Sequence, residues 1–205
     1  MGLACSSARQ RLASFLVLNP HLSERRWELS EAQVRVIAAT WSLAQSHPDF
    51  ASRVFTRILL KHSELGPLFG LKEGQGVDSS NCDNFLGKHL ELFRQFLDGA
   101  VQALSSSNSA LAFGLFRRLG TRHSLRAVPL GYRFLQGFVE SILQTLAECE
   151  ADVLSGAARL EAESAWRRFL NIGVEEMRDA ALKNTRRGTL NVESNPNLSS
   201  RAGKD

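Results

Sequence analysis

Apolar residues recur at steps of three and four from Ser30 to Leu182, and this spacing constrains the fold more than any other feature of the chain. It is typical of amphipathic helices that bury one face. It predicts helices at 30–47, 49–61, 83–104, 110–123, 130–149 and 160–182. Because no strand-like alternation of useful length and no internal repeat is found, we expect an all-α protein.

The chain is expected to contain one helical domain at 30–182 between two flexible extensions. Residues 1–29 mix small, basic and apolar side chains without a sustained helical period. Residues 183–205 are basic and rich in Asn and Ser, with too little apolar surface to offset chain entropy. We therefore expect a disordered basic tail there.

The positive charge lies mainly at the two ends of the chain. Residues 1–30 hold four basic and two acidic side chains, and residues 183–205 hold five and two, whereas 31–182 hold sixteen and seventeen. A nearly neutral domain argues against a nucleic-acid partner. Basic ends suit the anionic surface of a membrane.

The cysteines are sparse and do not form a metal or disulfide pattern. Cys5, Cys82 and Cys149 show no CxxC spacing, which fits a reducing compartment. No apolar run is long enough for a transmembrane helix, and the stretch at 15–18 is too short for the core of a signal peptide.

Two histidines, His89 and His123, are 34 residues apart, and each lies within an apolar pattern near one end of a predicted helix. An iron porphyrin needs an axial imidazole on a rigid helix, together with apolar walls. This arrangement can bring two imidazoles to opposite sides of a flat ligand. Spacing alone equally allows His123 to cap a helix end and His89 to pack in an ordinary core.

Several segments, in order, resemble those of haem globins of the neuroglobin-like and globin X-like groups. Leu119-Gly120-Thr121-Arg122-His123 resembles the segment that ends in the proximal ligand. Phe85 to His89, running on to Val101, is similar to the distal helix. Trp41, Pro67-Leu68-Phe69, and Ala165-Trp166 through Met177 also match. The resemblance covers roughly 31–182.

The resemblance implies a globin fold of about seven helices around a haem b pocket. It implies that His123 is the proximal iron ligand and that His89 is the distal one. Phe69 would wedge against the haem face, Phe55 would be the distal aromatic, and Phe93 would lie one turn after His89. With this crowded pocket we expect bis-histidine ligation, in which His89 must detach before O2, CO or NO binds.

Two parts of the pattern leave alternatives open. Anchoring the distal helix on Phe85 puts Lys88 at the distal position, whereas anchoring it on Asp98 puts His89 there. We favour His89, because a Lys ammonium is costly to desolvate beneath a porphyrin. Leu92 stands where a basic residue often meets a haem propionate, so Arg94, Arg122 and Arg126 are the candidates for that contact.

The first residues, Met1-Gly2-Leu3-Ala4-Cys5-Ser6, match the pattern for N-myristoylation at Gly2, and Cys5 lies where palmitoylation would follow. One acyl chain binds membranes only marginally, so a second, helped by nearby arginines, would anchor the chain. Acylated members are known in the globin X-like and nematode groups that the chain resembles. We expect a peripheral protein on the cytoplasmic face of the plasma membrane, or a cytoplasmic one if it is not acylated.

These expectations lead to four hypotheses. The first is a membrane-anchored haem protein that acts in electron transfer or redox signalling with an unknown redox partner. The second is an enzyme that acts on NO, nitrite or superoxide, although no dedicated catalytic motif is present. The third is an O2 store or carrier, which hexacoordination disfavours. The fourth is a haemless module that binds a partner protein.

Overall fold

The computed structural model describes residues 28–71, 85–126 and 131–193, with side chains up to Thr185 in the last helix. The chain divides into two units between residues 30 and 31. The site and the packing described below lie in the second unit.

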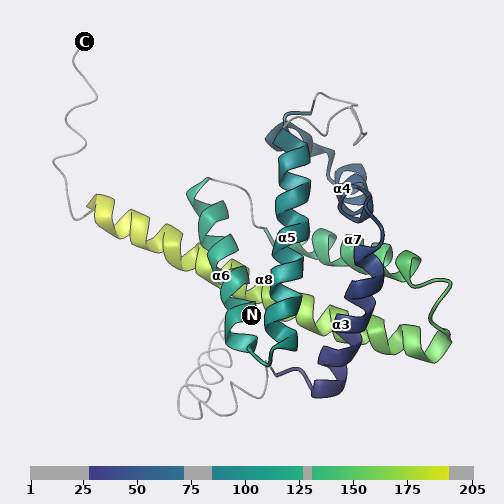
Figure 1. Ribbon diagram of the computed structural model, residues 1–205. Helices are drawn as coiled ribbons and strands as arrows, with labels where there is room; N and C mark the ends of the chain where they lie inside the picture. Colours follow the sequence, from purple (N-terminus) through teal and green to yellow (C-terminus); the bar gives the residue numbers. More distant parts are fainter. Residues whose placement is uncertain (1–27, 72–84, 127–130, 194–205) are drawn as a thin grey trace, which may run out of the picture. The chain divides into compact units, whose positions relative to one another are not determined.

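In chain order, the elements are α3 (Glu31–Gln45), α4 (Phe50–Lys61), the 3-10 helix η1 (Ser63–Phe69), α5 (Phe85–Ser105), α6 (Ser109–Leu125), α7 (Tyr132–Cys149) and α8 (Gly156–Glu193) (Figure 1). The described residues contain no strand, which confirms the all-α class. Each predicted helical segment is occupied by a helix, and apart from the C-terminal end of α8 the ends differ by a few residues. The Gly-Pro break at 66–67 lies inside η1.

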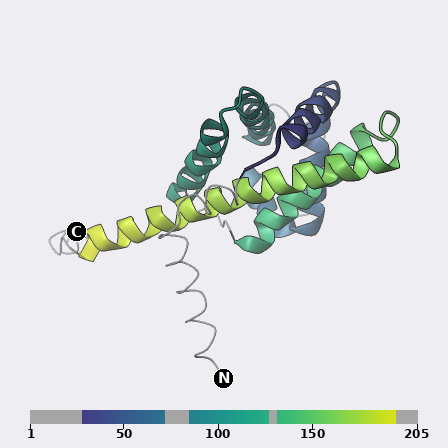
Figure 2. The ribbon, with the colours of Figure 1, turned by 90° about the horizontal axis from the view of Figure 1, so that it is seen from below.

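The last helix differs most from expectation. We predicted that it ends at Leu182 and that a disordered tail begins at Lys183, whereas α8 continues to Glu193 and projects beyond the other helices in Figure 2. No proline interrupts this stretch, and the Asn184 amide donates to Ser124 Oγ of α6 at 3.0 Å. The polar composition of 183–193 therefore does not end the helix. Residues 194–205 lie outside the described part.

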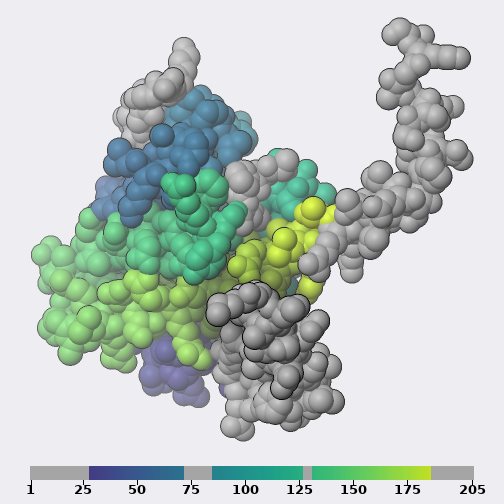
Figure 3. Space-filling model, turned by 180° about the vertical axis from the view of Figure 1, so that it is seen from behind, coloured from purple at the N-terminus to yellow at the C-terminus, as the bar shows by residue number. Residues whose placement is uncertain are grey.

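Helix α8 is the element against which α3, α6 and α7 pack, and α5 packs against α3, α4 and α6. Figure 3 shows α7 beside the first part of α8. A Cβ atom at Gly173 of α8 would lie 2.4 Å from the Phe116 ring of α6. Because only glycine leaves room for that ring, α6 and α8 approach closely at Phe116, two turns before His123 in α6.

Two buried tryptophans attach α3 to its neighbours through their indole N–H groups. Trp166 Nε1 of α8 donates to Thr40 Oγ1 at 2.7 Å, and Trp41 Nε1 donates to Asp98 Oδ1 of α5 at 3.1 Å. A buried indole N–H without an acceptor is costly, so these bonds select one packing of α3 against α5 and α8.

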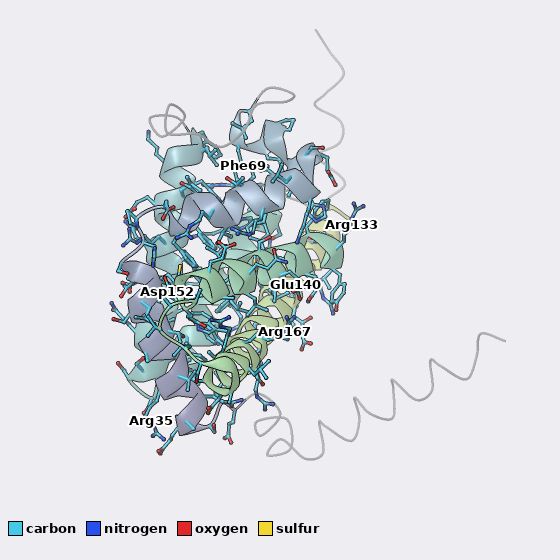
Figure 4. The ribbon with its side chains drawn as sticks, turned by 90° about the vertical axis from the view of Figure 1, so that its right-hand side faces the viewer. Arg35, Phe69, Arg133, Glu140, Asp152 and Arg167 are labelled. Carbon is cyan, nitrogen blue, oxygen red and sulfur yellow. The ribbon has the colours of Figure 1, made fainter. Side chains whose placement is uncertain are left out.

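An ion-pair cluster joins α7 to α8 at the surface. Arg167 of α8 pairs with Glu140 of α7 and donates to Glu163 Oε1 of its own helix at 2.8 Å. In Figure 4, the labelled Arg167 and Glu140 lie in neighbouring helices, whereas Phe69 lies at another end of the structure. The cluster therefore supports the scaffold and does not belong to the site described below.

Candidate functional site

His123 lies in the last turn of α6, and one of its ring nitrogens is already bonded. Its Nδ1 donates to the carbonyl oxygen of Leu119, one turn earlier, at 2.9 Å. A carbonyl oxygen only accepts, so the neutral ring carries its proton on Nδ1 and leaves Nε2 with a free lone pair. This is the form of the imidazole that binds a metal ion through Nε2.

His89 faces His123 from α5. The centres of the two rings are 6.5 Å apart, and their planes are inclined at 77°. Lys88, the other residue considered for this position, is exposed. The structure therefore brings His89, and not Lys88, against His123.

The distance between the two rings can be compared with that of two imidazoles sharing one metal ion. Since a metal–imidazole nitrogen bond is about 2 Å and each nitrogen lies about 1 Å from its ring centre, ligands on opposite sides have centres about 6 Å apart. The observed 6.5 Å fits this arrangement.

Two imidazoles alone do not make a complete metal site. Over 28–71, 85–126 and 131–193, no three His, Cys, Asp or Glu side chains lie close enough together to hold a metal ion. Binding of iron by His89 and His123 therefore requires a ligand that supplies further donors, as a porphyrin does.

Phe55, fully buried in α4, is the centre of an aromatic cluster beside the histidines. Four rings meet it nearly edge to face: Phe69 at 5.4 Å, His89 at 5.5 Å, Phe93 at 5.4 Å and Phe138 at 5.5 Å between centres. Phe69 also contacts His89, at 5.1 Å. The structure thus brings together all five residues expected to hold a cofactor.

Two aromatic neighbours were not predicted as part of the site. Phe138 joins the cluster from α7, where the sequence shows only an apolar stripe. Phe85 stacks on His89, with ring centres 6.3 Å apart and planes inclined at 26°. The separation of four residues between Phe85 and His89 was the available signal for this second contact, because such residues are neighbours on a helix.

Both imidazoles are held in the neutral form. Burial lowers the pKa of His89 to about 4, and repulsion from His123 and from the Arg126 guanidinium adds to this. Burial also lowers the pKa of His123, against the effect of its hydrogen bond to Leu119. At pH 7, no proton therefore competes for the nitrogens that would bind a metal ion.

Of the three arginines considered for a propionate contact, Arg126 is the one whose charge lowers the pKa of both histidines. It caps α6 one turn after His123, its backbone N–H donates to the His123 carbonyl at 3.1 Å, and its charge acts on both imidazoles. Arg94 instead donates to the Gln45 carbonyl of α3 at 3.0 Å. Arg122 is exposed. A carboxylate at the edge of the site would meet Arg126.

The acylation residues Gly2 and Cys5 lie in 1–27, outside the described residues. Cys82, in 72–84, also lies outside them. Among the helices that the structure does describe, none has the length and hydropathy needed to cross a bilayer. Cys149 is a buried free thiol at the end of α7.

Comparison with models of protein families gives no match for this chain, and comparison with curated proteins gives none either.

Proposed function

We propose that the chain is a haem globin in which His123 is the proximal ligand of the iron and His89 the distal one. The observation that carries this proposal is the pair of neutral imidazoles with ring centres 6.5 Å apart, contributed by two helices of an all-α domain. The aromatic cluster around Phe55 supports it, because a porphyrin needs apolar walls.

Each residue has a role in holding haem b. The Nδ1 bond to Leu119 orients His123, and the resulting tautomer presents Nε2 to the iron. Phe55, Phe69 and Phe93 would exclude water from the macrocycle, and Arg126 would hold a propionate. When bound, haem supplies an iron that cycles between ferrous and ferric states and that takes up diatomic gases.

The bis-histidine arrangement favours electron transfer or redox signalling, with a redox partner that is unknown. His89 and His123 would hold the iron in both oxidation states, so the site would change little in geometry when an electron is transferred. With haem bound, O2, NO or CO would have to compete with His89 for the iron, so their apparent affinity would be the intrinsic affinity multiplied by the fraction of molecules in which His89 is released. This competition argues against O2 storage. Chemistry on NO, nitrite or superoxide would need the same release.

We also propose that the chain is attached to the cytoplasmic face of the plasma membrane by myristoylation at Gly2 and palmitoylation at Cys5. Two acyl chains give stable anchoring where one gives only transient contact. An anchored protein suits exchange of electrons with a partner at the membrane more than transport of O2 through the cytoplasm.

The test is the absorption spectrum of the full-length chain purified with haem, in both oxidation states. We expect a low-spin six-coordinate spectrum in each. His89→Leu should convert the ferrous form to five-coordinate high-spin, and His123→Ala should lose or loosen haem. His47→Ala, a histidine in the turn between α3 and α4, is the control and should match the wild type.

Two results would count against the proposal. A chain that takes up no haem when haem is offered is not a haem globin. A wild type that binds haem but is five-coordinate retains His123 as ligand and excludes His89.

A further inference from the structure

The ring of His89 is bounded by three phenylalanines that differ in exposure. Phe55 and Phe69 contact it at 5.5 and 5.1 Å from the interior, and both are buried. Phe85 contacts it at 6.3 Å and is 57% exposed. His89 therefore lies between two fixed rings and one ring that faces solvent.

The position of Phe85 follows from the geometry of α5. Side chains of an α-helix lean towards its N-terminus, so a residue covers the surface above the residue four positions earlier. His89 accordingly leans back over Phe85, and the two ring planes lie within 26° of parallel. Such offset pairs are favourable at the observed separation.

The buried and the exposed phenylalanines around His89 differ in how readily they move. Besides His89, three rings of the aromatic cluster pack on Phe55, so displacing it disturbs a packed core. Phe85 is half in water, where side chains change rotamer in picoseconds to nanoseconds. When the His89 imidazole moves away from His123, it can displace Phe85 without disrupting the core. Displacing Phe55 would disrupt it.

We propose that Phe85 is a positioning residue that holds His89 in the orientation for binding iron and sets the rate at which His89 is released. The inference rests on the proposed function and adds the element that controls access of gases to the iron. Phe85 acts through His89 and does not itself need to touch the haem.

The first test uses the haem-loaded full chain, comparing the wild type with Phe85→Ala. After flash photolysis of the ferrous CO form, rebinding kinetics give the rate of His89 release. We expect this rate to rise between about two- and ten-fold, the factor that corresponds to loss of one aromatic pair. Phe85→Leu, which keeps apolar bulk without the planar ring, should lie between them.

The control is Leu160→Ala, which removes an apolar side chain that is 70% exposed on α8, away from the site. It should leave the release rate unchanged. Equal rates in the wild type and Phe85→Ala, both six-coordinate, overturn the role of Phe85 and leave the proposed function standing. A five-coordinate wild type overturns both the role of Phe85 and the assignment of His89 as a ligand, and leaves His123 as the ligand.

A second measurement needs no haem. Diethyl pyrocarbonate modifies accessible neutral imidazoles, and peptide mass spectrometry follows each histidine separately. In the haem-free chain, Phe85→Ala should raise the rate of modification of His89 relative to that of His123 at least two-fold. The reason is that the substitution removes the ring that covers His89 on its solvent side. An unchanged ratio contradicts the proposal, even if the variant fails to retain haem.

Discussion

Gly120 of α6 and Met177 of α8 approach so closely that a Cβ atom at Gly120 would lie 1.9 Å from the Met177 carbonyl oxygen. The obstacle is backbone, which cannot move aside as a flexible side chain can. His123 stands one turn after Gly120, so this contact sets how far the His123 imidazole reaches towards His89.

Gly120→Ala should therefore displace α6 from α8 and destabilise the protein. Overpacking of this kind costs about 1–3 kcal/mol, and the melting temperature should fall by several degrees. Gly114→Ala is the matched control on the same helix, because its Cβ would meet only the end of the Arg117 side chain at 3.6 Å. Thermal unfolding of both variants checks this, and a Gly120→Ala variant as stable as Gly114→Ala would show that the close approach is wrong.

The pKa of His89 predicts a loss of stability in acid. Because burial lowers it to about 4 from an ordinary 6.5, the unfolded chain binds a proton between these values that the folded chain does not. Stability is thus complete above pH 6.5 and is lost as the pH falls towards 4. Urea unfolding of the haem-free chain at pH 7 and 4.5 should show a smaller loss for His89→Leu than for the wild type or His47→Ala. An equal loss in all three would contradict the burial of His89.

Glu150 predicts the opposite pH dependence. It is 2% exposed beyond the end of α7, its Oε1 has no hydrogen-bond partner among the described residues, and burial raises its pKa to about 7. The Arg159 guanidinium offsets this only in part. The folded chain therefore retains a proton that the unfolded chain releases, and stability is lost as the pH rises from 4.5 through 7.

Glu150→Gln, which keeps the shape and stays neutral, should raise the free energy of unfolding at pH 8 by about 1–3 kcal/mol and change it little at pH 4. Glu161→Gln, at an exposed position of α8, is the control. Denaturant unfolding at the two pH values measures the difference. If Glu150→Gln gains nothing at pH 8, the carboxyl is solvated.

If Arg126 holds a haem propionate, its substitution should speed the loss of haem. Arg126→Gln removes the cation that acts on both imidazoles, and should speed transfer of haem to an excess of a haem-free acceptor protein by several-fold, as expected for loss of a charge-assisted hydrogen bond. Arg122→Gln, one turn earlier at the end of α6, should transfer haem at the rate of the wild type. If the two variants lose haem equally fast, Arg126 makes no propionate contact.

The N-terminal motif predicts attachment to membranes in cells. The wild type should be recovered in the membrane fraction, and Gly2→Ala, which cannot be myristoylated, should move to the soluble fraction. Cys5→Ser should shift the distribution partway, because one acyl chain binds only transiently. Unchanged recovery of Gly2→Ala would reject acylation as the anchor.

The amino-acid sequence by itself determined the helical class, the approximate position of each helix, and the residues worth testing as a site. Apolar spacing carries this information because the period of a helix is local. Spacing alone left His123 and His89 open to ordinary structural roles, and they were selected because the segments that contain them resemble those of haem globins. The end of α8 could not be predicted, because composition favoured a tail where contact with Ser124 of α6 supports a longer helix.

Only the tertiary structure decided that two imidazoles 34 residues apart face each other at 6.5 Å, with His89 and not Lys88 inward. It likewise decided that Phe138 joins the cluster and that Gly120 rests against the backbone of Met177. The physical reason is that spacing along a chain fixes which face of its own helix a residue occupies. Which faces meet, and how closely, follows from packing every helix against all the others at once.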